Sequence, residues 1–138
     1  MQQLEGFQYI TSLDLNMGYY TIRLPPASQD MMTIVTEFWK LGYNCLPMGM
    51  CASGDIFQYK VDGLLGDIEV VKTYIDGILV LNKDCFRKHT EQMIMILGRL
   101  RASGLKVNAP KCSFGLNEIT YLSYVITKEV IKPKKKKV

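Results

Sequence analysis

Two short runs of β-forming residues flank an acidic turn near the middle of the chain. The runs are Val70–Tyr74 and Ile78–Leu81, and Asp76 stands in the turn between them. Apolar runs of this length around a tight turn predict a β-hairpin. An unpaired carboxylate is costly to remove from water, so an acidic residue at the junction of two apolar strands indicates a functional role. Asp76 is therefore a candidate site residue.

Apolar residues recur at helical spacing in two stretches, one on either side of this hairpin. The first stretch predicts a helix that Ser53 or Asp55 can cap and that runs to about Leu65. The second predicts a helix over residues 85–102, which Gly104 terminates.

The other apolar stretches are short and rich in β-branched and aromatic residues, so they predict strands. Segments 32–38 and 43–46 are expected to form a hairpin around Lys40–Gly42. Because hairpins imply antiparallel pairing, the predicted fold class is α+β, with an antiparallel sheet and helices packed on one face. Further extended structure is expected at Phe7–Leu15, Tyr19–Leu24, Leu105–Asn108 and Ile119–Thr127.

Composition is typical of a globular protein inside the cell. The 138 residues are the length of one domain, and 48% of them are apolar. No apolar run approaches the ~20 residues of a membrane span, and the first residues do not resemble a secretory signal. We therefore expect an intracellular protein, cytoplasmic or nuclear, without a membrane partner.

The four cysteines and the single histidine do not form a zinc or disulfide pattern. The cysteines are far apart, so we expect reduced and mostly packed thiols. His89 has charged neighbours in the second predicted helix, and we expect it to be exposed and inert.

The net charge is +4, but much of the excess lies in the last seven residues, so charge is weak evidence for nucleic-acid binding.

A second carboxylate, Asp14, ends the first predicted strand. If its strand neighbours the acidic hairpin, Asp14 and Asp76 emerge at one edge or face of the sheet. Clustered carboxylates with open positions suit Mg²⁺, which keeps waters and substrate phosphates as its remaining ligands. Spacing alone leaves open the alternative of two unrelated surface aspartates.

Five segments of the chain carry recognisable motifs in a fixed order. They are Phe7–Leu24, Leu46–Gln58, Tyr74–Gly77, Gly104–Phe114 and Tyr121–Ile126. In this order they resemble the motifs of reverse transcriptases from gypsy-like long-terminal-repeat retrotransposons. The acidic turn is similar to the family motif Tyr-x-Asp-Asp, but Gly77 stands in place of the second Asp.

The resemblance implies RNA-directed DNA polymerisation by a two-metal mechanism that uses Mg²⁺ or Mn²⁺. It implies that Asp14 and Asp76 are catalytic metal ligands. Lys111 would lie near the triphosphate as a catalytic proton donor, with a solvated surface lysine as the alternative. The implied partners are an RNA or DNA template–primer, a deoxynucleoside triphosphate and the remainder of a polyprotein.

The resemblance also implies two groups of binding residues. Tyr19 would be an aromatic gate that excludes a 2′-hydroxyl by steric clash, unless it is only a core tyrosine. Met48 and Gly49 would lie against the incoming nucleotide and the template base. The end of the primer would be held by Tyr121, Leu122, Ser123 and Tyr124.

Four departures from the family pattern reduce the expected activity. Gly77 removes a carboxylate, Gly54 replaces a proline, Ser123 replaces a glycine in the primer-holding turn, and Met32 replaces a lysine before the strand that begins at Thr33. Relative to the family, we also expect a truncated copy that lacks most of the fingers and the thumb. The chain alone is therefore not expected to be a competent polymerase. The alternatives are a non-catalytic nucleic-acid-binding remnant and a degenerate relic.

The resemblance divides the chain into two parts. Residues 1–127 are interpreted as a reverse-transcriptase palm with a remnant of the fingers. Residues 128–138 are expected to be a flexible Lys-rich tail, and a nuclear localisation signal is the alternative interpretation of the tail.

Overall fold

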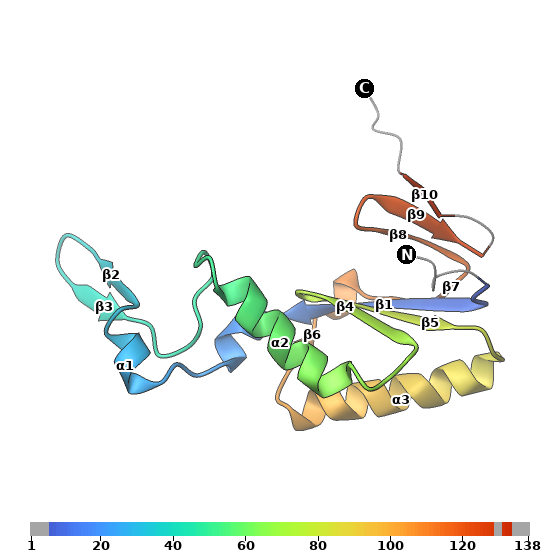
Figure 1. Cartoon of the computed structure of the whole chain (residues 1–138), viewed down its shortest axis with the longest axis horizontal. Helices are drawn as coiled ribbons and strands as arrows, with labels where there is room; N and C mark the ends of the chain where they lie inside the picture. Colours follow the sequence, from blue (N-terminus) through green and yellow to red (C-terminus); the bar gives the residue numbers. More distant parts are fainter. Residues whose placement is uncertain (1–5, 129–130, 134–138) are drawn as a thin grey trace.

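An antiparallel sheet of five strands forms the centre of the structure, a computed structural model that describes residues 6–128 and 131–133 (Figure 1). The strand order is β4-β5-β1-β6, and β7 also pairs with β1. All of these pairings are antiparallel, as the sequence predicts. The strands are β1 (Tyr9–Asn16), β4 (Val71–Tyr74), β5 (Gly77–Asn82), β6 (Lys106–Val107) and β7 (Ser113–Leu116).

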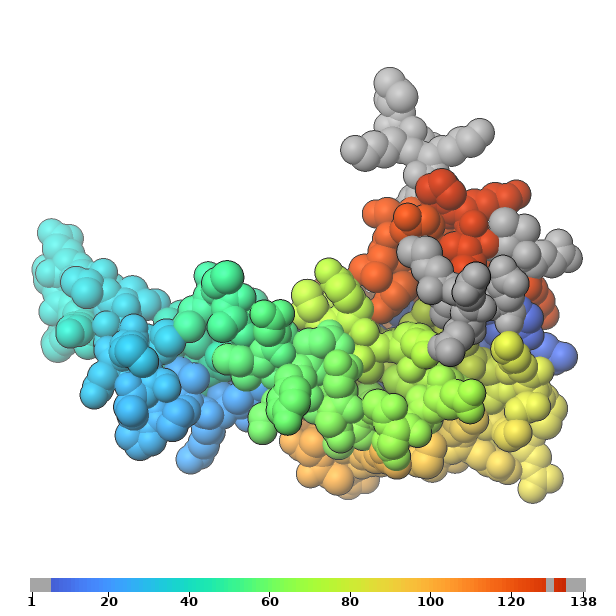
Figure 2. All heavy atoms as spheres, in the orientation of Figure 1, coloured from blue at the N-terminus to red at the C-terminus, as the bar shows by residue number. Residues whose placement is uncertain are grey.

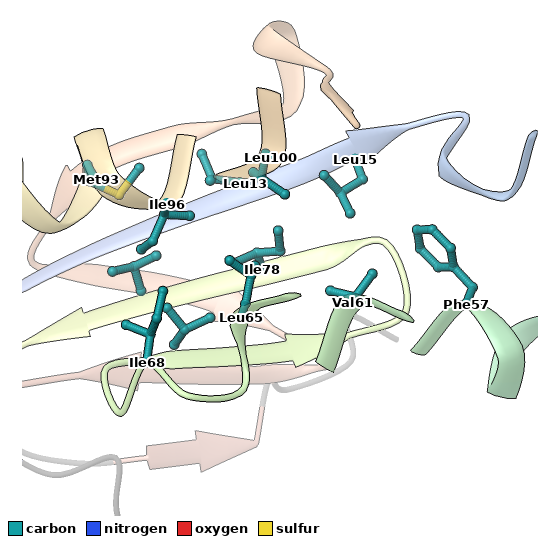
Figure 3. Close-up of a cluster of buried hydrophobic side chains, with 12 residues drawn as sticks. Leu13, Leu15, Phe57, Val61, Leu65, Ile68, Ile78, Met93, Ile96 and Leu100 are labelled. Atoms are coloured by element: carbon teal, nitrogen blue, oxygen red, sulfur yellow. The ribbon is translucent and has the colours of Figure 1, made fainter. Parts of the chain in front are cut away.

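Two helices, α2 (Ser53–Leu65) and α3 (Phe86–Ala102), cover one face of this sheet. Side chains alternate between the faces of a strand, so Leu13 and Leu15 of β1 point toward the helices and pack with Ile78 of β5. The helices bury one apolar stripe each against them, which closes the main core. The helix residues of this core are Phe57, Val61, Leu65, Met93, Ile96 and Leu100 (Figure 3).

A three-stranded sheet lies against the other face of the central sheet (Figure 1). Its order is β10-β9-β8, and its Ile126 packs against Ile10 of β1 and Leu79 of β5 in a second buried cluster. The central sheet is therefore covered on both faces. The three strands are β8 (Glu118–Tyr121), β9 (Tyr124–Thr127) and β10 (Ile131–Pro133).

A smaller part of the chain projects from this body at the left of Figures 1 and 2. It contains the short helix α1 (Pro26–Gln29) and the hairpin of β2 (Thr33–Val35) and β3 (Lys40–Gly42). Phe38 and Trp39, in the turn of this hairpin, are both exposed. The projecting part thus has little core of its own.

The predicted fold class is confirmed, but two predicted element boundaries are wrong. The segment Tyr19–Leu24, predicted to be extended, begins inside a 3-10 helix, η1 (Gly18–Thr21). Residues 40–42, predicted as the turn of a hairpin, are the strand β3, and the turn lies at residues 36–39.

The end of the chain also differs from the prediction. Residues 119–127, predicted as one strand, form the hairpin of β8 and β9. Ile131–Pro133, predicted to belong to a flexible tail from residue 128, pair with β9. Residues 129–130 and 134–138 of that predicted tail lie outside the described residues.

His89 is buried, which corrects the prediction of an exposed side chain. It is 3% exposed on the inner face of α3, and its Nε2 lies 2.8 Å from the Thr11 Oγ1. Burial lowers the pKa of the His89 imidazole. Its Nδ1 has no hydrogen-bond partner among the described residues.

The cysteines and the helices bear on two further predictions. All four cysteines are free, but Cys51 and Cys85 are exposed, so the thiols are not mostly packed as predicted. None of the helices in the described part of the chain combines the length and the apolar character needed to cross a bilayer.

Candidate functional site

The two candidate carboxylates lie at the same end of the central sheet. β1 and β5 are neighbours, and Asp14 pairs directly with Gly77, the residue after Asp76. The backbone N–H of Leu15 donates to the Asp76 carbonyl at 2.7 Å, which fixes the turn against β1. The condition stated from the sequence, that the strand of Asp14 neighbours the acidic hairpin, is therefore met.

Asp14 and Asp76 line one cavity of about 200 Å³ at this end of the sheet. Three other residues singled out from the sequence, Tyr19, Met48 and Lys111, line the same cavity. Residues that come from four separate parts of the chain thus converge on one site. The remaining lining residues, to which the sequence analysis gave no role, are Leu15, Asn16, Met17, Gly18 and Asn108.

Lys111 is the cation of the cavity. It ends a short 3-10 helix, η2 (Ala109–Lys111), and its Nζ lies 3.7 Å from Oδ1 of Asp14. The backbone N–H of Asn108 donates to the Asp14 carbonyl at 2.7 Å, which holds η2 against the end of β1. The Lys111 side chain is 65% exposed, so its attraction to Asp14 is screened by water and leaves the ammonium free to reorient.

Tyr19 forms one wall of the cavity from η1. Its ring stacks on buried Phe57 of α2, with centroids 4.8 Å apart and planes 23° apart. Burial, and then the nearby charge of Asp76, raise the pKa of the Tyr19 phenol, which therefore stays neutral at physiological pH. Tyr19 thus lies both at the edge of the core and in the wall of the cavity, and its role as an aromatic gate stays a prediction.

The acidic turn has a strained backbone. Ile75 has a φ of 53°, in the left-handed region, where a β-branched residue is an outlier. Its backbone N–H donates to Oε1 of Gln58 on α2 at 2.5 Å, and Nε2 of Gln58 donates to the Thr73 hydroxyl at 2.9 Å. Gln58 thus holds both the strained turn and the strand that leads into it.

Sequence reasoning assigned no role to Gln58. The residue lies one position after Phe57 on the buried side of α2, and its side chain is partly buried against β4. A polar residue beside the apolar stripe of a helix is the only sequence signal, and that signal does not name its partner.

The predicted nucleotide- and primer-binding residues are only partly brought together. Gly49 has a φ of +93° and is exposed next to Met48, outside the cavity lining. Leu122 and Ser123 form the turn between β8 and β9, both with positive φ, and Tyr124 follows them on β9. Tyr121 ends β8 and packs beside Gly77, so the segment predicted to bind the primer borders the acidic turn.

The oxygen donors at this site suit one Mg²⁺ ion. Mg²⁺ is usually held in proteins by one or two carboxylates together with waters and substrate phosphates, and Asp14 and Asp76 provide such a pair. Within residues 6–128 and 131–133, no group of three or more His, Cys, Asp or Glu residues is placed to hold a metal. The protein therefore offers two carboxylates, and it has a glycine at the position opposite Asp14.

Comparison with known proteins places these residues in context. A family model described as "Reverse transcriptase (RNA-dependent DNA polymerase)" matches residues 1–126. The "Retrovirus-related Pol polyprotein from transposon 412" of Drosophila melanogaster is 29% identical over 140 residues, which cover 99% of this chain and 11% of the polyprotein. The "Transposon Tf2-7 polyprotein" of Schizosaccharomyces pombe is 24% identical over 135 residues, which cover 96% of this chain and 10% of the polyprotein. The chain thus spans about a tenth of the length of the curated relatives it matches.

Solved structures with the same fold include foamy viral protease-reverse transcriptases. The foamy viral protease-reverse transcriptase in complex with an RNA/DNA hybrid superposes with a TM-score of 0.87 at 23% identity, covering 94% of this chain and 18% of that chain. The native Prototype Foamy Virus Protease-Reverse Transcriptase superposes with a TM-score of 0.81 at 26% identity, covering 96% of this chain and 18% of that chain.

Proposed function

The chain belongs to the reverse transcriptase family, and on this premise we propose that it is the polymerase palm of a retrotransposon Pol polyprotein. The proposed reaction is RNA-directed DNA synthesis on a template–primer with deoxynucleoside triphosphates. We further propose that Gly77 impairs this reaction in the present chain.

One observation carries the proposal. Asp14 and Asp76, from strands far apart in the sequence, line one cavity together with Tyr19, Met48 and Lys111. A cavity that presents two carboxylates, a mobile ammonium and an aromatic wall suits a substrate that combines phosphates with a flat base and a sugar. The fold of the structural neighbours supports the same interpretation.

Each residue of the cavity has a proposed task. Asp14 and Asp76 would hold Mg²⁺, which supplies charge neutralisation of the phosphates and activation of the attacking hydroxyl when it is bound. Lys111, exposed and free to reorient, would donate a proton to the leaving phosphate oxygen. Tyr19, held by Phe57, would present a rigid ring beneath the sugar.

Gly77 weakens this arrangement at a defined point. It pairs with Asp14 across β1 and β5, so a side chain at position 77 would stand directly beside the Asp14 carboxylate. A glycine there leaves one fewer negative charge to attract a divalent ion. Because misplacing a reacting group by 1 Å costs about a hundredfold in rate, loss of a metal ligand is expected to lower catalysis strongly.

The proposed function is tested with a labelled RNA template annealed to a DNA primer. We expect the chain to bind this hybrid with a Mg²⁺-dependent component that Asp14→Asn and Asp76→Asn each remove, as measured by fluorescence anisotropy. Asp30→Asn is the matched control, because Asp30 is exposed at the end of α1 and does not line the cavity. A Mg²⁺-dependent component that survives both cavity substitutions would contradict the proposal.

Gly77 also favours a second candidate, a non-catalytic nucleic-acid-binding protein of the same fold. Such a protein binds mainly through phosphate contacts, so its affinity falls steeply with salt and does not change on chelation of metal. Anisotropy titrations with and without a chelator distinguish the two candidates. A primer-extension assay tests the proposed impairment: we expect no extension by this chain, and robust Mg²⁺-dependent synthesis would contradict it.

A further inference from the structure

The Tyr121 hydroxyl is a buried polar group without a hydrogen bond. Tyr121 lies at the end of β8, and within the described residues its hydroxyl oxygen has no partner. Buried hydroxyls are normally paired, because an unpaired one loses its hydrogen bonds to water without compensation. An orphaned hydroxyl at the border of the acidic turn therefore requires an explanation.

Gly77 is the residue that this hydroxyl faces. A Cβ atom added to Gly77 would lie 3.6 Å from Cε2 of Tyr121 and 3.8 Å from its hydroxyl oxygen. The nearest atom to this added Cβ would be the Tyr74 carbonyl oxygen at 3.4 Å, which is an ordinary contact distance. The backbone φ of Gly77 is outside the left-handed region, so a side chain can be added there without strain.

The space at position 77 therefore accommodates a side chain that ends near the hydroxyl. An aspartate carries its carboxylate oxygens one C–C and one C–O bond beyond Cβ, which brings one of them within hydrogen-bonding distance of a hydroxyl placed 3.8 Å from Cβ. The pairing of position 77 with Asp14 would leave the other oxygen beside the Asp14 carboxylate.

We propose that Tyr121 is a positioning residue whose hydroxyl donates a hydrogen bond to a carboxylate at position 77, and that the present chain retains this donor without its acceptor. The proposal rests on the proposed function and deepens it, because it identifies what would orient a carboxylate at position 77 beside Asp14. It assigns Tyr121 to the acidic turn, in addition to any contact with a primer.

The surroundings of Tyr121 suit a donor. Burial, and then the neighbouring Tyr74 and Asp76, raise the pKa of the Tyr121 phenol, so it keeps its proton at neutral pH. A protonated phenol next to a carboxylate forms a short, charge-assisted hydrogen bond. Such a bond would fix one rotamer of the carboxylate and offset part of its repulsion with Asp14.

A double-mutant cycle of urea unfolding, without metal or nucleotide, tests the proposal. In the native chain, we expect Tyr121→Phe to leave the unfolding constant unchanged or lower it, because the lost hydroxyl had no partner. In the Gly77→Asp chain, we expect the same substitution to raise the unfolding constant about tenfold, the loss of one charge-assisted hydrogen bond. Equal effects in the two backgrounds would overturn the proposal.

The matched control is Tyr124→Phe, which removes the same atom from the residue that pairs with Tyr121 across β8 and β9. It is expected to have the same effect in both backgrounds. If Gly77→Asp does not fold, Gly77→Asn provides a neutral acceptor of the same shape, for which a coupling of about threefold is expected. Independently of either variant, a tenfold rise in the unfolding constant on Tyr121→Phe in the native chain would show that the Tyr121 hydroxyl does have a hydrogen-bond partner there, and would contradict the proposal.

A second readout follows the Tyr121 phenol itself. The chain has eight tyrosines, so the Cζ carbon is labelled with ¹³C and the Tyr121 signal is assigned by its loss in Tyr121→Phe. The Gly77→Asp substitution is expected to raise the pKa of Tyr121 further, because the new carboxylate accepts its proton in a hydrogen bond. An unchanged pKa would show that the two groups do not meet. Neither readout depends on polymerase activity, so failure here and failure of the proposed function are separable.

Discussion

A methyl group at position 18 is expected to destabilise the chain through Phe57. A Cβ atom added to Gly18 would lie 2.7 Å from Cε2 and 3.3 Å from Cε1 of the Phe57 ring, and closer still to Cζ. Carbon atoms prefer separations of about 3.5–4.0 Å, so the ring would have to move by on the order of 1 Å. Phe57 is 1% exposed and is stacked on Tyr19, so its ring cannot move by this amount without giving up packing contacts, including the stack on Tyr19.

The expected cost of Gly18→Ala is about 2 kcal/mol in the free energy of unfolding, within the usual range for an overpacked core. The assay is urea unfolding at pH 7 followed by far-ultraviolet circular dichroism, with the slope compared between variants. Gly63→Ala is the matched control, since a Cβ there meets nothing within 4 Å, and it should stabilise α2 by about 0.5–1 kcal/mol. Equal stability of Gly18→Ala and the native chain would refute the packing argument.

Three further predictions follow from the structure. Gln58→Leu removes the acceptor of the Ile75 N–H and should lower the unfolding free energy by about 1–3 kcal/mol, with faster hydrogen exchange of the Ile75 amide as the specific readout. Ser123→Gly should raise the unfolding free energy by about 1 kcal/mol, because Ser123 has a φ of 65°, whereas Ser103→Gly, at a φ of −81°, should not. His89 has its pKa lowered by burial from 6.5, so the unfolded chain takes up a proton first as pH falls. The contribution of His89 to the unfolding free energy should be constant above pH 7 and should fall below pH 6.5 by at most about 1.4 kcal/mol per pH unit. The His89→Gln substitution should remove this pH dependence. If the dependence persists in His89→Gln, it arises from other groups.

The regular elements could be predicted where pattern and propensity agree. Both long helices and the acidic hairpin have the spacing of apolar residues that their structures require, and Gly104 ends α3 with a φ of +79°. The proximity of Asp14 and Asp76 followed from the assumption that their strands are neighbours, and the register of β1 and β5 confirms it.

The errors have identifiable physical causes. The β-forming residues around Tyr19 are held in a 3-10 helix, in which the Thr21 hydroxyl donates to the Gly18 carbonyl at 2.6 Å and Gly18 packs on Phe57. The turn of Leu122 and Ser123 lacks the Gly or Asn that positive φ values favour, so residue propensity marked no break between β8 and β9, although the family resemblance placed Ser123 in a turn.

His89 could have been placed correctly from the sequence. Its spacing from Met93, Ile96 and Leu100 is that of one helix face, and all four residues are buried on α3. The charged residues beside it in sequence point elsewhere on the helix, and they were given too much weight. The partner of Gln58 and the orphaned hydroxyl of Tyr121, in contrast, depend on tertiary contacts that no local pattern reveals.

The central claim is that Asp14 and Asp76 are the retained part of a divalent-metal site that Gly77 leaves incomplete. The most direct measurement is calorimetric titration of Mg²⁺ or Mn²⁺ into the native chain, Gly77→Asp, and Gly77→Asp combined with Asp14→Asn, each with a template–primer present. The account predicts that Gly77→Asp binds the ion at least about tenfold more tightly than the native chain, and that the added Asp14→Asn removes this gain. Equal affinities of the native chain and Gly77→Asp would contradict it.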